Sequence, residues 1–366
     1  MNYEQQKMLT CIGNKRSLVK KIEEIVEKDI LTELNKDKIN ILDGFAGSSV
    51  VSRSLSKYAS TIYSNDLELY SSTMAQCFLI KPSDKDKEII YKHIDEMNQL
   101  AKNGPFVEGV ICEMYSPNDT ENIKEDERCF YTRENALIID TLRKYIEDEV
   151  ESNLFHYCIT PLLIKASIHT NTGGVFKGFY KDKETKIGKF GGSAENNLDR
   201  IKSQINLEYP VWSDCSFKSY VYNQDINELI TELPKNLDLI YYDPPYNEHP
   251  YSSNYFMLNI ILKNETPKNV SKISGIPSDW TRSDYNYEKK AIKAMKELLE
   301  ESINKTKYIL LSYNNEGIIS TEKWEDIFSN YKVKKYEITY GTYKASRNLK
   351  QRSNKVIEIM YLISKN

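Results

Sequence analysis

Cysteine pairs at metal-binding spacing are missing from this 366-residue sequence, and histidine is scarce. The six cysteines stand singly, none in a Cys-x-x-Cys arrangement, and the four histidines are scattered. A zinc site or a disulfide framework needs such residues in closely spaced sets. We therefore expect no bound metal and reduced thiols, as in cytoplasmic proteins.

Long hydrophobic runs are also missing. No apolar stretch of roughly 18 residues occurs, and the first residues contain no apolar leader-like segment, so the sequence indicates a cytoplasmic protein with no membrane partner. An excess of basic residues is absent too, since the formal net charge is -3. Any nucleic-acid site must therefore come from a local concentration of lysine and arginine.

Short apolar runs, by contrast, recur along the chain and read as buried strands. Each early run is followed by a loop and a helical pattern, which favours an α/β fold with a mostly parallel sheet. The last two runs flank Gly341 and predict an antiparallel hairpin at one edge of the sheet. The runs lie at residues 39–42, 61–63, 220–222, 237–242, 308–312, 336–340 and 356–363.

The strand pattern stops in the middle of the chain. Residues 72–213 are polar, with helical stretches at 134–145 and 153–168, before strand signals resume. We predict a catalytic domain made of residues 1–71 and 214–366, with a mainly helical domain of residues 72–213 inserted into it.

The strongest motif is Asp243-Pro244-Pro245-Tyr246, which follows the apolar run 237–242. Two prolines end a strand sharply and hold the backbone rigid, at the strand end where ligands bind in open α/β sheets. An aromatic amine is a poor nucleophile, because its lone pair is delocalised into its ring. A carboxylate and a rigid carbonyl can orient such an amine by accepting its hydrogen bonds, while Tyr246 stacks on the ring.

Weaker motifs accompany it in the same order as the strands. A glycine-containing loop, Asp43-Gly44-Phe45-Ala46-Gly47, follows the first strand and would let a cofactor approach the backbone. Asp66, 23 positions after Asp43 (66 − 43), ends the next strand, where an acid commonly binds ribose hydroxyls. Asp225 precedes the next helix, and Gly13-Asn14-Lys15 opens a helix near the start.

Taken together, these motifs resemble the Dam-like, alpha-group DNA adenine methyltransferases of bacteria and phages. Ser312-Tyr313-Asn314-Asn315 also looks like an element of that family. The resemblance implies a Rossmann-like methyltransferase fold, S-adenosyl-methionine as the methyl donor and double-stranded DNA as the substrate. It also suggests a restriction-modification or orphan modification methylase, the former with a cognate restriction endonuclease as partner.

The resemblance assigns roles to individual residues. Asp243, Pro244, Pro245 and Tyr246 would be catalytic, acting on an adenine flipped out of the duplex. Phe45 and Gly47 would flank the methionine part of the cofactor, and Asp225 its adenine. The remaining cofactor-binding residues would be Cys11, Gly13, Lys15, Asp43, Asp66 and Asp243. Two positions depart from the family pattern, which often has an aromatic residue at position 11 and a glycine at position 49, where this chain has Cys11 and Ser49.

Lysines within the predicted insertion mark a DNA-binding face. The loop-like stretch 171–190 contains several glycines and more lysines than acids, as contacts to phosphates require. The predicted DNA-binding residues are Asn171, Thr172, Lys177, Lys181, Lys183, Lys186 and Lys189. A second basic cluster, which would flank the same groove, consists of Lys344, Arg347, Lys350 and Arg352.

Two other interpretations use the same residues. The enzyme would methylate adenine in RNA, or the chain would be a catalytically silent methyltransferase-like protein that binds DNA. The order of motifs and the mid-chain insertion favour DNA over RNA. A silent protein would have no chemical need for the Asp-Pro-Pro-Tyr motif.

Overall fold

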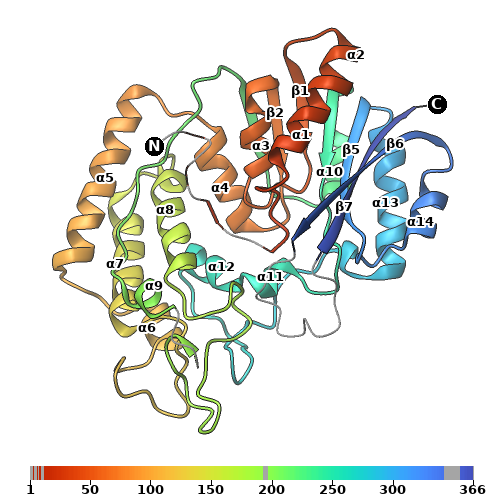
Figure 1. Ribbon diagram of the computed structural model, residues 1–366. Coiled ribbons are helices and arrows are strands. Elements are labelled where there is room, and N and C mark those ends of the chain that lie inside the picture. Colours follow the sequence, from red (N-terminus) through yellow and green to blue (C-terminus); the bar gives the residue numbers. More distant parts are fainter. Residues whose placement is uncertain are drawn as a thin grey trace. The chain divides into compact units, whose positions relative to one another are not determined.

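The computed structural model describes residues 3, 6, 8, 9, 12–192, 197–341 and 355–365. The chain divides into two compact units, which we describe separately (Figure 1). Unit 1 consists of Met1–Ile12, Gln76–Trp212 and Tyr251–Thr281, and unit 2 of Gly13–Ala75, Ser213–Pro250 and Arg282–Asn366. Cys11 and the predicted basic cluster Lys344, Arg347, Lys350 and Arg352 lie outside the described residues.

Unit 2 is built on a seven-stranded sheet with the order β3-β2-β1-β4-β5-β7-β6. Neighbouring strands are parallel from β3 through β5, whereas β7 is antiparallel to both β5 and β6. This confirms the predicted mostly parallel α/β sheet with an antiparallel edge hairpin. The strands are β1 (Ile39–Asp43), β2 (Ala59–Asn65), β3 (Lys218–Tyr222), β4 (Leu237–Tyr242), β5 (Thr306–Asn314), β6 (Tyr331–Gly341) and β7 (Lys355–Lys365).

Apolar residues predominate in the central strands because these strands are largely buried on both faces. In β5, eight of nine residues are buried, and in β4 five of six. One core cluster joins the inner residues of these strands and β7 to α10, α13 and α14. The helices of unit 2 are α1 (Val19–Ile25), η2 (Val26–Leu31), α2 (Thr32–Leu34), α3 (Val50–Leu55), η3 (Ser56–Tyr58), α10 (Ile226–Glu232), η5 (Asp284–Asn286), α13 (Glu288–Ser302) and α14 (Thr321–Ile327), and α4 (Leu69–Leu79) passes from unit 2 into unit 1.

Unit 1 is mainly helical. Helix α7 packs against α5, α6 and α8, and α12 packs against both α7 and α8. Helices α7 and α8 occupy the two stretches in which the sequence predicts helices. The helices are α5 (Asp84–Asn103), α6 (Val110–Tyr115), α7 (Arg133–Glu149), α8 (Phe155–Ile168), α9 (Leu198–Lys202), α11 (Tyr251–Asn254) and α12 (Phe256–Lys263).

The units differ from the predicted domain boundaries at 72 and 213. Unit 1 also takes in Met1–Ile12 and Tyr251–Thr281, which the sequence-based division assigns to the catalytic domain. The reason is packing: the apolar residues of α12 are buried, and this helix lies on α7 and α8. The chain therefore enters unit 1 again after the Asp-Pro-Pro-Tyr motif, which the sequence pattern did not indicate.

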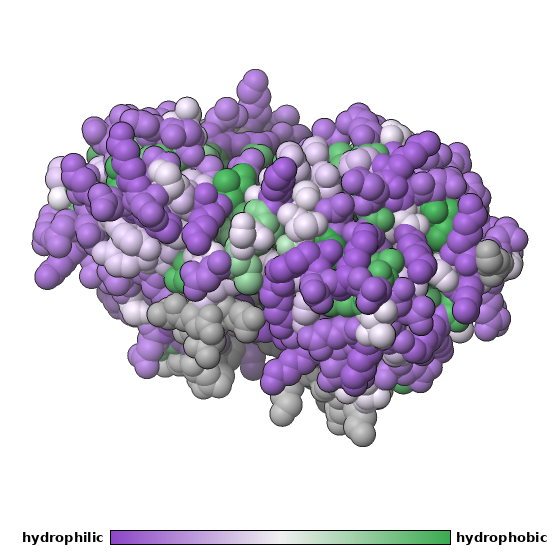
Figure 2. Space-filling model, turned by 90° about the horizontal axis from the view of Figure 1, so that it is seen from above, coloured by the Kyte–Doolittle hydropathy of each residue, from purple (hydrophilic) through white to green (hydrophobic). Residues whose placement is uncertain are grey.

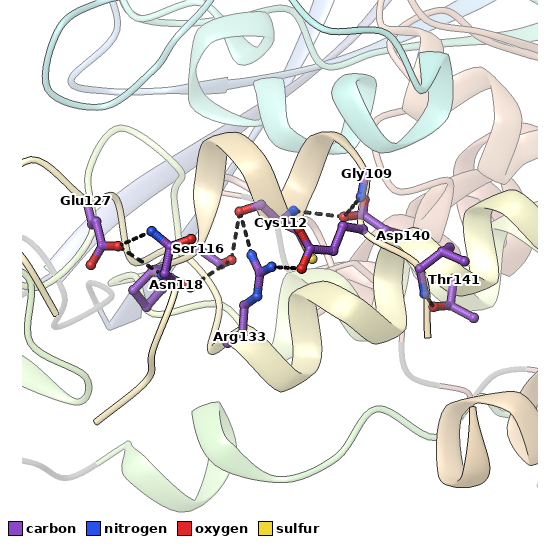
Figure 3. A network of polar contacts seen from close by, with 11 residues as sticks. Gly109, Cys112, Ser116, Asn118, Glu127, Arg133, Asp140 and Thr141 are labelled. Atoms are coloured by element: carbon purple, nitrogen blue, oxygen red, sulfur yellow. Dashed lines mark hydrogen bonds and ion pairs between the residues drawn. The ribbon is translucent and has the colours of Figure 1, made fainter. Parts of the chain in front are cut away.

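A buried carboxylate joins two helices of unit 1. Asp140 of α7 accepts hydrogen bonds from the backbone N–H groups of Gly109, Ile111 and Cys112, at the start of α6 (Figure 3). These are N–H groups that the helix itself cannot satisfy. Burial raises the pKa of Asp140, and the three N–H donors oppose this. Arg133 adds a hydrogen bond to the carbonyl of Cys112, so a second side chain of α7 holds α6 in place.

The molecular face in Figure 2 is mostly hydrophilic, and hydrophobic residues are visible on it only in small separate patches. Such isolated apolar residues are normal on a protein surface in water. None of the described helices is long and apolar enough to cross a membrane. Among the described residues, no group of histidine, cysteine and acidic side chains is arranged to hold a metal ion.

Candidate active site

The candidate site of unit 2 lies where β1 and β4 end side by side at the centre of the sheet. Asp43 is the last residue of β1 and lies beside Tyr241 of β4, while Asp243 directly follows β4. Parallel strands bring their carboxyl ends to one sheet edge, so both aspartates belong to that edge. The structure thus brings together two motifs that are about 200 residues apart in the sequence.

A lysine lies between two carboxylates at this edge. The Nζ atom of Lys15 lies 2.7 Å from Oδ1 of Asp243 and 3.2 Å from Oε1 of Glu358 on β7. It also donates a hydrogen bond to the carbonyl of Gly13. The Lys15 side chain is only 4% exposed and that of Asp243 is 20% exposed. The ion pair is therefore largely shielded from water, whereas the aspartate keeps an open side.

The ammonium of Lys15 and the carboxylates of Asp243 and Glu358 shift the pKa values of one another. Burial alone would lower the pKa of Lys15, but the carboxylates of Asp243 and Glu358 raise it well above its ordinary value. Burial raises the pKa of Asp243, which the ammonium of Lys15 opposes and the carboxylate of Glu358 reinforces. Lys15 therefore stays positively charged and orients the carboxylate of Asp243.

Glu358 is a residue of this site that the sequence analysis missed. It is 1% exposed, and it accepts a hydrogen bond of 2.6 Å from the hydroxyl of Ser312 on β5. The signal was present in the sequence, because Glu358 is the one acid within the apolar run 356–363. A buried carboxylate needs a charged or hydrogen-bonding partner, so an acid inside an apolar strand indicates that such a partner lies beside it.

A backbone hydrogen bond holds the turn that follows β4. The backbone N–H of Ile318 donates a 3.0 Å hydrogen bond to the carbonyl of Tyr246, and Pro244 is buried. Tyr246 is partly buried and packs against the core cluster, and burial raises the pKa of its hydroxyl. The segment Asp243–Tyr246 is therefore a rigid turn that leaves part of the tyrosine ring accessible.

The glycine loop after β1 requires its glycines. At Gly44, a Cβ atom would come 2.5 Å from the ring of Tyr242, so no larger residue fits. Gly47 has a φ of +52°, which glycine adopts without strain. Ser49 has a φ of +61° and is fully buried, and its hydroxyl has no hydrogen-bond partner. The frequent glycine of the resembling family at this position thus has a physical reason.

Asp43 carries an unused acceptor. Its Oδ2 atom accepts a hydrogen bond from the hydroxyl of Ser52, whereas its buried Oδ1 atom has no partner. Burial raises the pKa of this carboxyl to about 7. An unpaired buried acceptor is costly, which makes Oδ1 a position for a hydrogen-bond donor of a ligand.

Asp66 holds the glycine loop. Its Oδ2 atom accepts from the N–H of Gly47 at 2.7 Å, and its Oδ1 atom from the N–H of Glu68 at 2.8 Å. Burial raises its pKa to about 6, and these backbone donors oppose the rise. The structure therefore gives Asp66 a supporting role, and its predicted ribose contact stays a prediction.

A small open pocket lies at the ends of β1, β2 and β3. The ring of Phe45 makes an edge contact with the ring of Tyr285, 5.2 Å between centroids. Asp225 caps α10 by accepting a hydrogen bond from the N–H of Asn227. The lining residues are Gly44, Phe45, Asn65, Leu67, Gln224, Asp225, Ile226, Ser283 and Tyr285.

Two of the pocket residues were predicted as cofactor ligands, and the structure brings them together. Phe45, expected beside the methionine part, lies in the same pocket as Asp225, expected beside the adenine. Tyr285 was missed because it lies in a polar stretch without strand or helix periodicity. Asn65 was not predicted as a ligand either. Its side chain bonds the carbonyls of Gly44 and Gln224, which ties the three strand ends together.

Comparison with known proteins identifies the family. Residues 12–327, more than half of the chain, match the model of the D12 class N6 adenine-specific DNA methyltransferases. The chain belongs to this family. The modification methylase StsI of Streptococcus sanguinis is 29% identical over 97% of this chain and 51% of its own length.

Two further relatives are Type II methyltransferases. M.NlaIII of Neisseria lactamica is 26% identical over 90% of this chain and 91% of its own length. M.FokI of Planomicrobium okeanokoites is 25% identical over 97% of this chain and 52% of its own length. The chain thus spans about half the length of StsI and M.FokI and most of the length of M.NlaIII.

In unit 1, the predicted DNA-binding residues separate into two groups. Asn171 is fully buried and bonds the carbonyls of Cys129 and Lys189 and the N–H of Gly191. Thr172 is buried as well. Both side chains are turned inward in this conformation, and their predicted contacts with DNA stay predictions. They support the loop from inside, since a buried amide must satisfy all its polar atoms.

Most lysines of the same stretch lie on a small hairpin of residues 180–189, and Lys177 precedes it. Residues Lys181 and Gly188 form an antiparallel bridge, and Asp182 stabilises the turn by accepting from the N–H groups of Glu184 and Thr185. Lys177, Lys183 and Lys186 are exposed, whereas Lys181 and Lys189 are half-buried. The Lys181 ammonium lies 4.9 Å from the ring centre of Phe179. Their predicted contacts with DNA stay predictions.

Proposed function

We propose that this chain transfers a methyl group from S-adenosyl-methionine to the N6 amine of an adenine in double-stranded DNA. The observation that best supports this proposal is the position of Asp243 at the rigid end of β4, where the buried Lys15 orients its carboxylate. An amine conjugated to a ring needs fixed acceptors that align its lone pair, and this turn provides them. The membership in the family of N6 adenine-specific DNA methyltransferases supports the same reaction.

The residues present fit the methyl donor. The unpartnered Oδ1 of Asp43 would accept a hydrogen bond from its ammonium group. The pocket lined by Phe45, Asp225 and Tyr285 would hold its adenine against the Phe45 side, with Asp225 accepting a hydrogen bond from the exocyclic amine. Asp66 would shape the loop that faces the ribose. When bound, the cofactor supplies an electrophilic methyl group on a positively charged sulfur.

The target base would be held by the Asp-Pro-Pro-Tyr turn. Because the adenine amine lies inside the duplex, the base must first be flipped out. The carboxylate of Asp243 and a backbone carbonyl of the turn would accept hydrogen bonds from the amine, while Tyr246 stacks on the ring. These acceptors would direct the lone pair of the nitrogen toward the methyl group that the cofactor supplies. One amine proton leaves through Asp243 to water.

Unit 1 would recognise the DNA sequence. Its hairpin presents lysines whose charge attracts phosphates, with Asp182 and Glu184 as the only acids in residues 177–190. We further propose that the chain acts in a restriction-modification system. This rests on the names of its relatives, which are modification methylases and Type II methyltransferases.

The test is methyl transfer by the purified chain with labelled S-adenosyl-methionine, followed by analysis of the modified nucleosides. We expect N6-methyladenine in duplex DNA and none in RNA of matched sequence. Sequencing of adenine methylation in cells that express the chain would then give the recognition site. Methylated RNA with unmodified DNA would overturn the choice of substrate. Cofactor binding without transfer to either nucleic acid would indicate a catalytically silent protein.

A further inference from the structure

A tight loop of unit 1, residues 269–278, presents an isoleucine to solvent. The loop closes on itself through hydrogen bonds from the N–H of Ser271 to the carbonyl of Ile276 and from the N–H of Gly275 to the carbonyl of Ser271. Val270 and Pro277 form an antiparallel bridge at its base. The loop is therefore a hairpin-like turn with a defined tip rather than an open connection.

Two side chains from elsewhere in unit 1 fix this tip. The guanidinium of Arg128 donates hydrogen bonds to the carbonyls of Lys272, Ile273 and Met114. The hydroxyl of Tyr115, a fully buried residue, donates to the carbonyl of Gly275 at 2.8 Å. These hydrogen bonds hold successive backbone groups of the tip, so its position in unit 1 is determined by neighbouring side chains.

The glycine of the tip is required by the same neighbours. Gly275 has a φ of +66°, and a Cβ atom there would come 2.9 Å from both Arg128 and the ring of Tyr115. A side chain at this position would push the anchoring groups away. The conformation of the loop is therefore fixed by contacts of its backbone with Arg128 and Tyr115.

The side chain at this anchored tip is nevertheless apolar and exposed. Ile273 is 64% exposed, the highest value among the exposed large hydrophobic residues described. Single exposed apolar residues are common on protein surfaces, so the exposure of Ile273 alone indicates nothing. Ile273 differs because Arg128 holds its backbone carbonyl, which keeps the exposed side chain at the tip. The rigid support and the apolar tip together indicate an interaction with a partner.

The surroundings of Ile273 indicate the kind of partner. The adjacent Lys272 is exposed, and the hydroxyl of Ser274 donates a hydrogen bond to the carbonyl of Lys177 at 2.7 Å. The tip therefore touches the segment that leads into the lysine hairpin. Together, residues 269–278 and 177–190 contain six lysines and two acids. A surface with this balance favours a polyanion.

We propose that Ile273 is an apolar wedge that enters duplex DNA and opens the base stack while the lysines hold the phosphates. This rests on the proposed DNA adenine methyltransferase function. Proteins that distort DNA often insert a rigid apolar side chain between base steps. The wedge would lower the cost of extruding the target adenine, since unstacking must be compensated when a base is flipped.

The Ile273→Ala variant tests the wedge on two DNA duplexes that contain the site found by sequencing. In one duplex the target adenine is paired with thymine, and in the other it faces an abasic position. On the paired duplex we expect kcat/KM to fall by about tenfold to a hundredfold, the scale of a missing contribution to unstacking. On the abasic duplex the variant should lose less activity, because an unpaired base costs less to extrude.

A second experiment measures directly how far the target base leaves the stack, by its fluorescence. A 2-aminopurine in place of the target adenine should become brighter when the unaltered chain binds, and much less so with Ile273→Ala. The matched control is Ile80→Ala, since Ile80 is an isoleucine of unit 1 that is 36% exposed and directly follows the end of α4. This control should behave like the unaltered chain on both duplexes.

The outcomes separate the wedge from the function it rests on. If the unaltered chain does not methylate DNA, the proposed function fails. If it does, and Ile273→Ala is equally active on the paired duplex, the wedge proposal is wrong, and Ile273 would bind another partner such as a protein. An equal loss on both duplexes would also overturn it, because a wedge contributes most where extrusion of the base costs most.

Discussion

The sheet edge of unit 2 and the loops of unit 1 place their charged residues in opposite ways. At the sheet edge, Lys15, Glu358 and Asp43 are buried and, apart from one carboxylate oxygen of Asp43, bonded to one another or to their neighbours. On the loops of unit 1, the charges of Lys183 and Lys186 are exposed, and buried residues support the loop from below.

The difference reflects two physical tasks. Chemistry on one amine requires acceptors that are already in place, and burial in a low-dielectric environment makes their interactions strong. Binding to a phosphate backbone needs charges that can reach many phosphates, and solvated lysines on loops meet this need. The following predictions test this contrast, beginning with the largest expected effect.

Replacing the oriented carboxylate should abolish turnover. We expect Asp243→Ala to lower kcat by roughly a hundredfold to a thousandfold or more, since one preorganised hydrogen bond to the reacting group is worth about 3 kcal/mol. Rates of methyl transfer to duplex DNA measure the effect, and thermal unfolding checks that the variant is folded. Near-normal methylation by a folded variant would show that Asp243 does not orient the amine.

The ring of Tyr246 should matter more than its hydroxyl. Stacking of an aromatic ring on a base is worth about 1–3 kcal/mol, so Tyr246→Ala should lose roughly tenfold to a hundredfold in kcat/KM. Tyr246→Phe keeps the ring and should retain most activity. Steady-state kinetics of the two variants on one duplex make the comparison. An equal loss in both would assign the role to the hydroxyl.

The lysines of the hairpin should contribute to affinity but not to the chemical step. Joint replacement of Lys177, Lys181, Lys183, Lys186 and Lys189 by alanine should weaken DNA binding and flatten its salt dependence. Each phosphate that the protein no longer neutralises reduces the log-log slope by roughly one. Titrations with DNA at several salt concentrations give the slope, and binding of S-adenosyl-methionine should be unchanged. An unaltered slope would place the phosphate-binding residues elsewhere.

Removing the second carboxylate should shift the pH dependence of the reaction. Burial and Glu358 raise the pKa of Asp243, while Lys15 lowers it, and Asp43, Asp66, Tyr241 and Tyr246 lie around the same group. A carboxylate that must be ionised is active above its pKa and loses activity as the pH falls through it. Glu358→Gln removes a like charge, so the pKa of Asp243 should fall.

The acid limb of kcat should therefore move to lower pH in Glu358→Gln, by roughly one unit. The pH profile is the decisive measurement, because a purely structural role of Glu358 would change stability without moving this limb. Ser312→Ala is the matched control, since it removes the other partner of Glu358 and leaves the charge in place. If the acid limb of the pH profile does not move in Glu358→Gln, the ionisation of Asp243 does not control the fall of kcat at low pH.

The smallest effect is expected at Ser49. Its left-handed backbone is strained for serine, and its buried hydroxyl lacks a partner. Ser49→Gly should therefore raise the free energy of unfolding by about 1 kcal/mol. Ser49→Ala removes the hydroxyl but keeps the strain, so it should stabilise less. Thermal unfolding of both variants compares the two contributions. Destabilisation by glycine would mean that the serine side chain packs favourably.

The sequence alone was sufficient for the parts of the molecule that depend on local patterns. Apolar runs separated by helical patterns predicted the strands, because a strand buried on both faces is rich in apolar residues. The Asp-Pro-Pro-Tyr motif indicated a rigid turn at a strand end, because two prolines allow little else. Strand polarity then placed Asp43 and Asp243 at one edge, as found.

Only the tertiary structure decided which side chains meet. Glu358 reaches Lys15 because β7 lies antiparallel beside β5, and no local pattern determines which strands are neighbours. Asn171 is buried although exposed glycines and an exposed lysine follow it within six residues, since loop residues turn inward wherever backbone groups need partners. Helix α12 belongs to unit 1 because its apolar residues pack on α7 and α8. Interactions between residues far apart in sequence depend on how the whole chain packs.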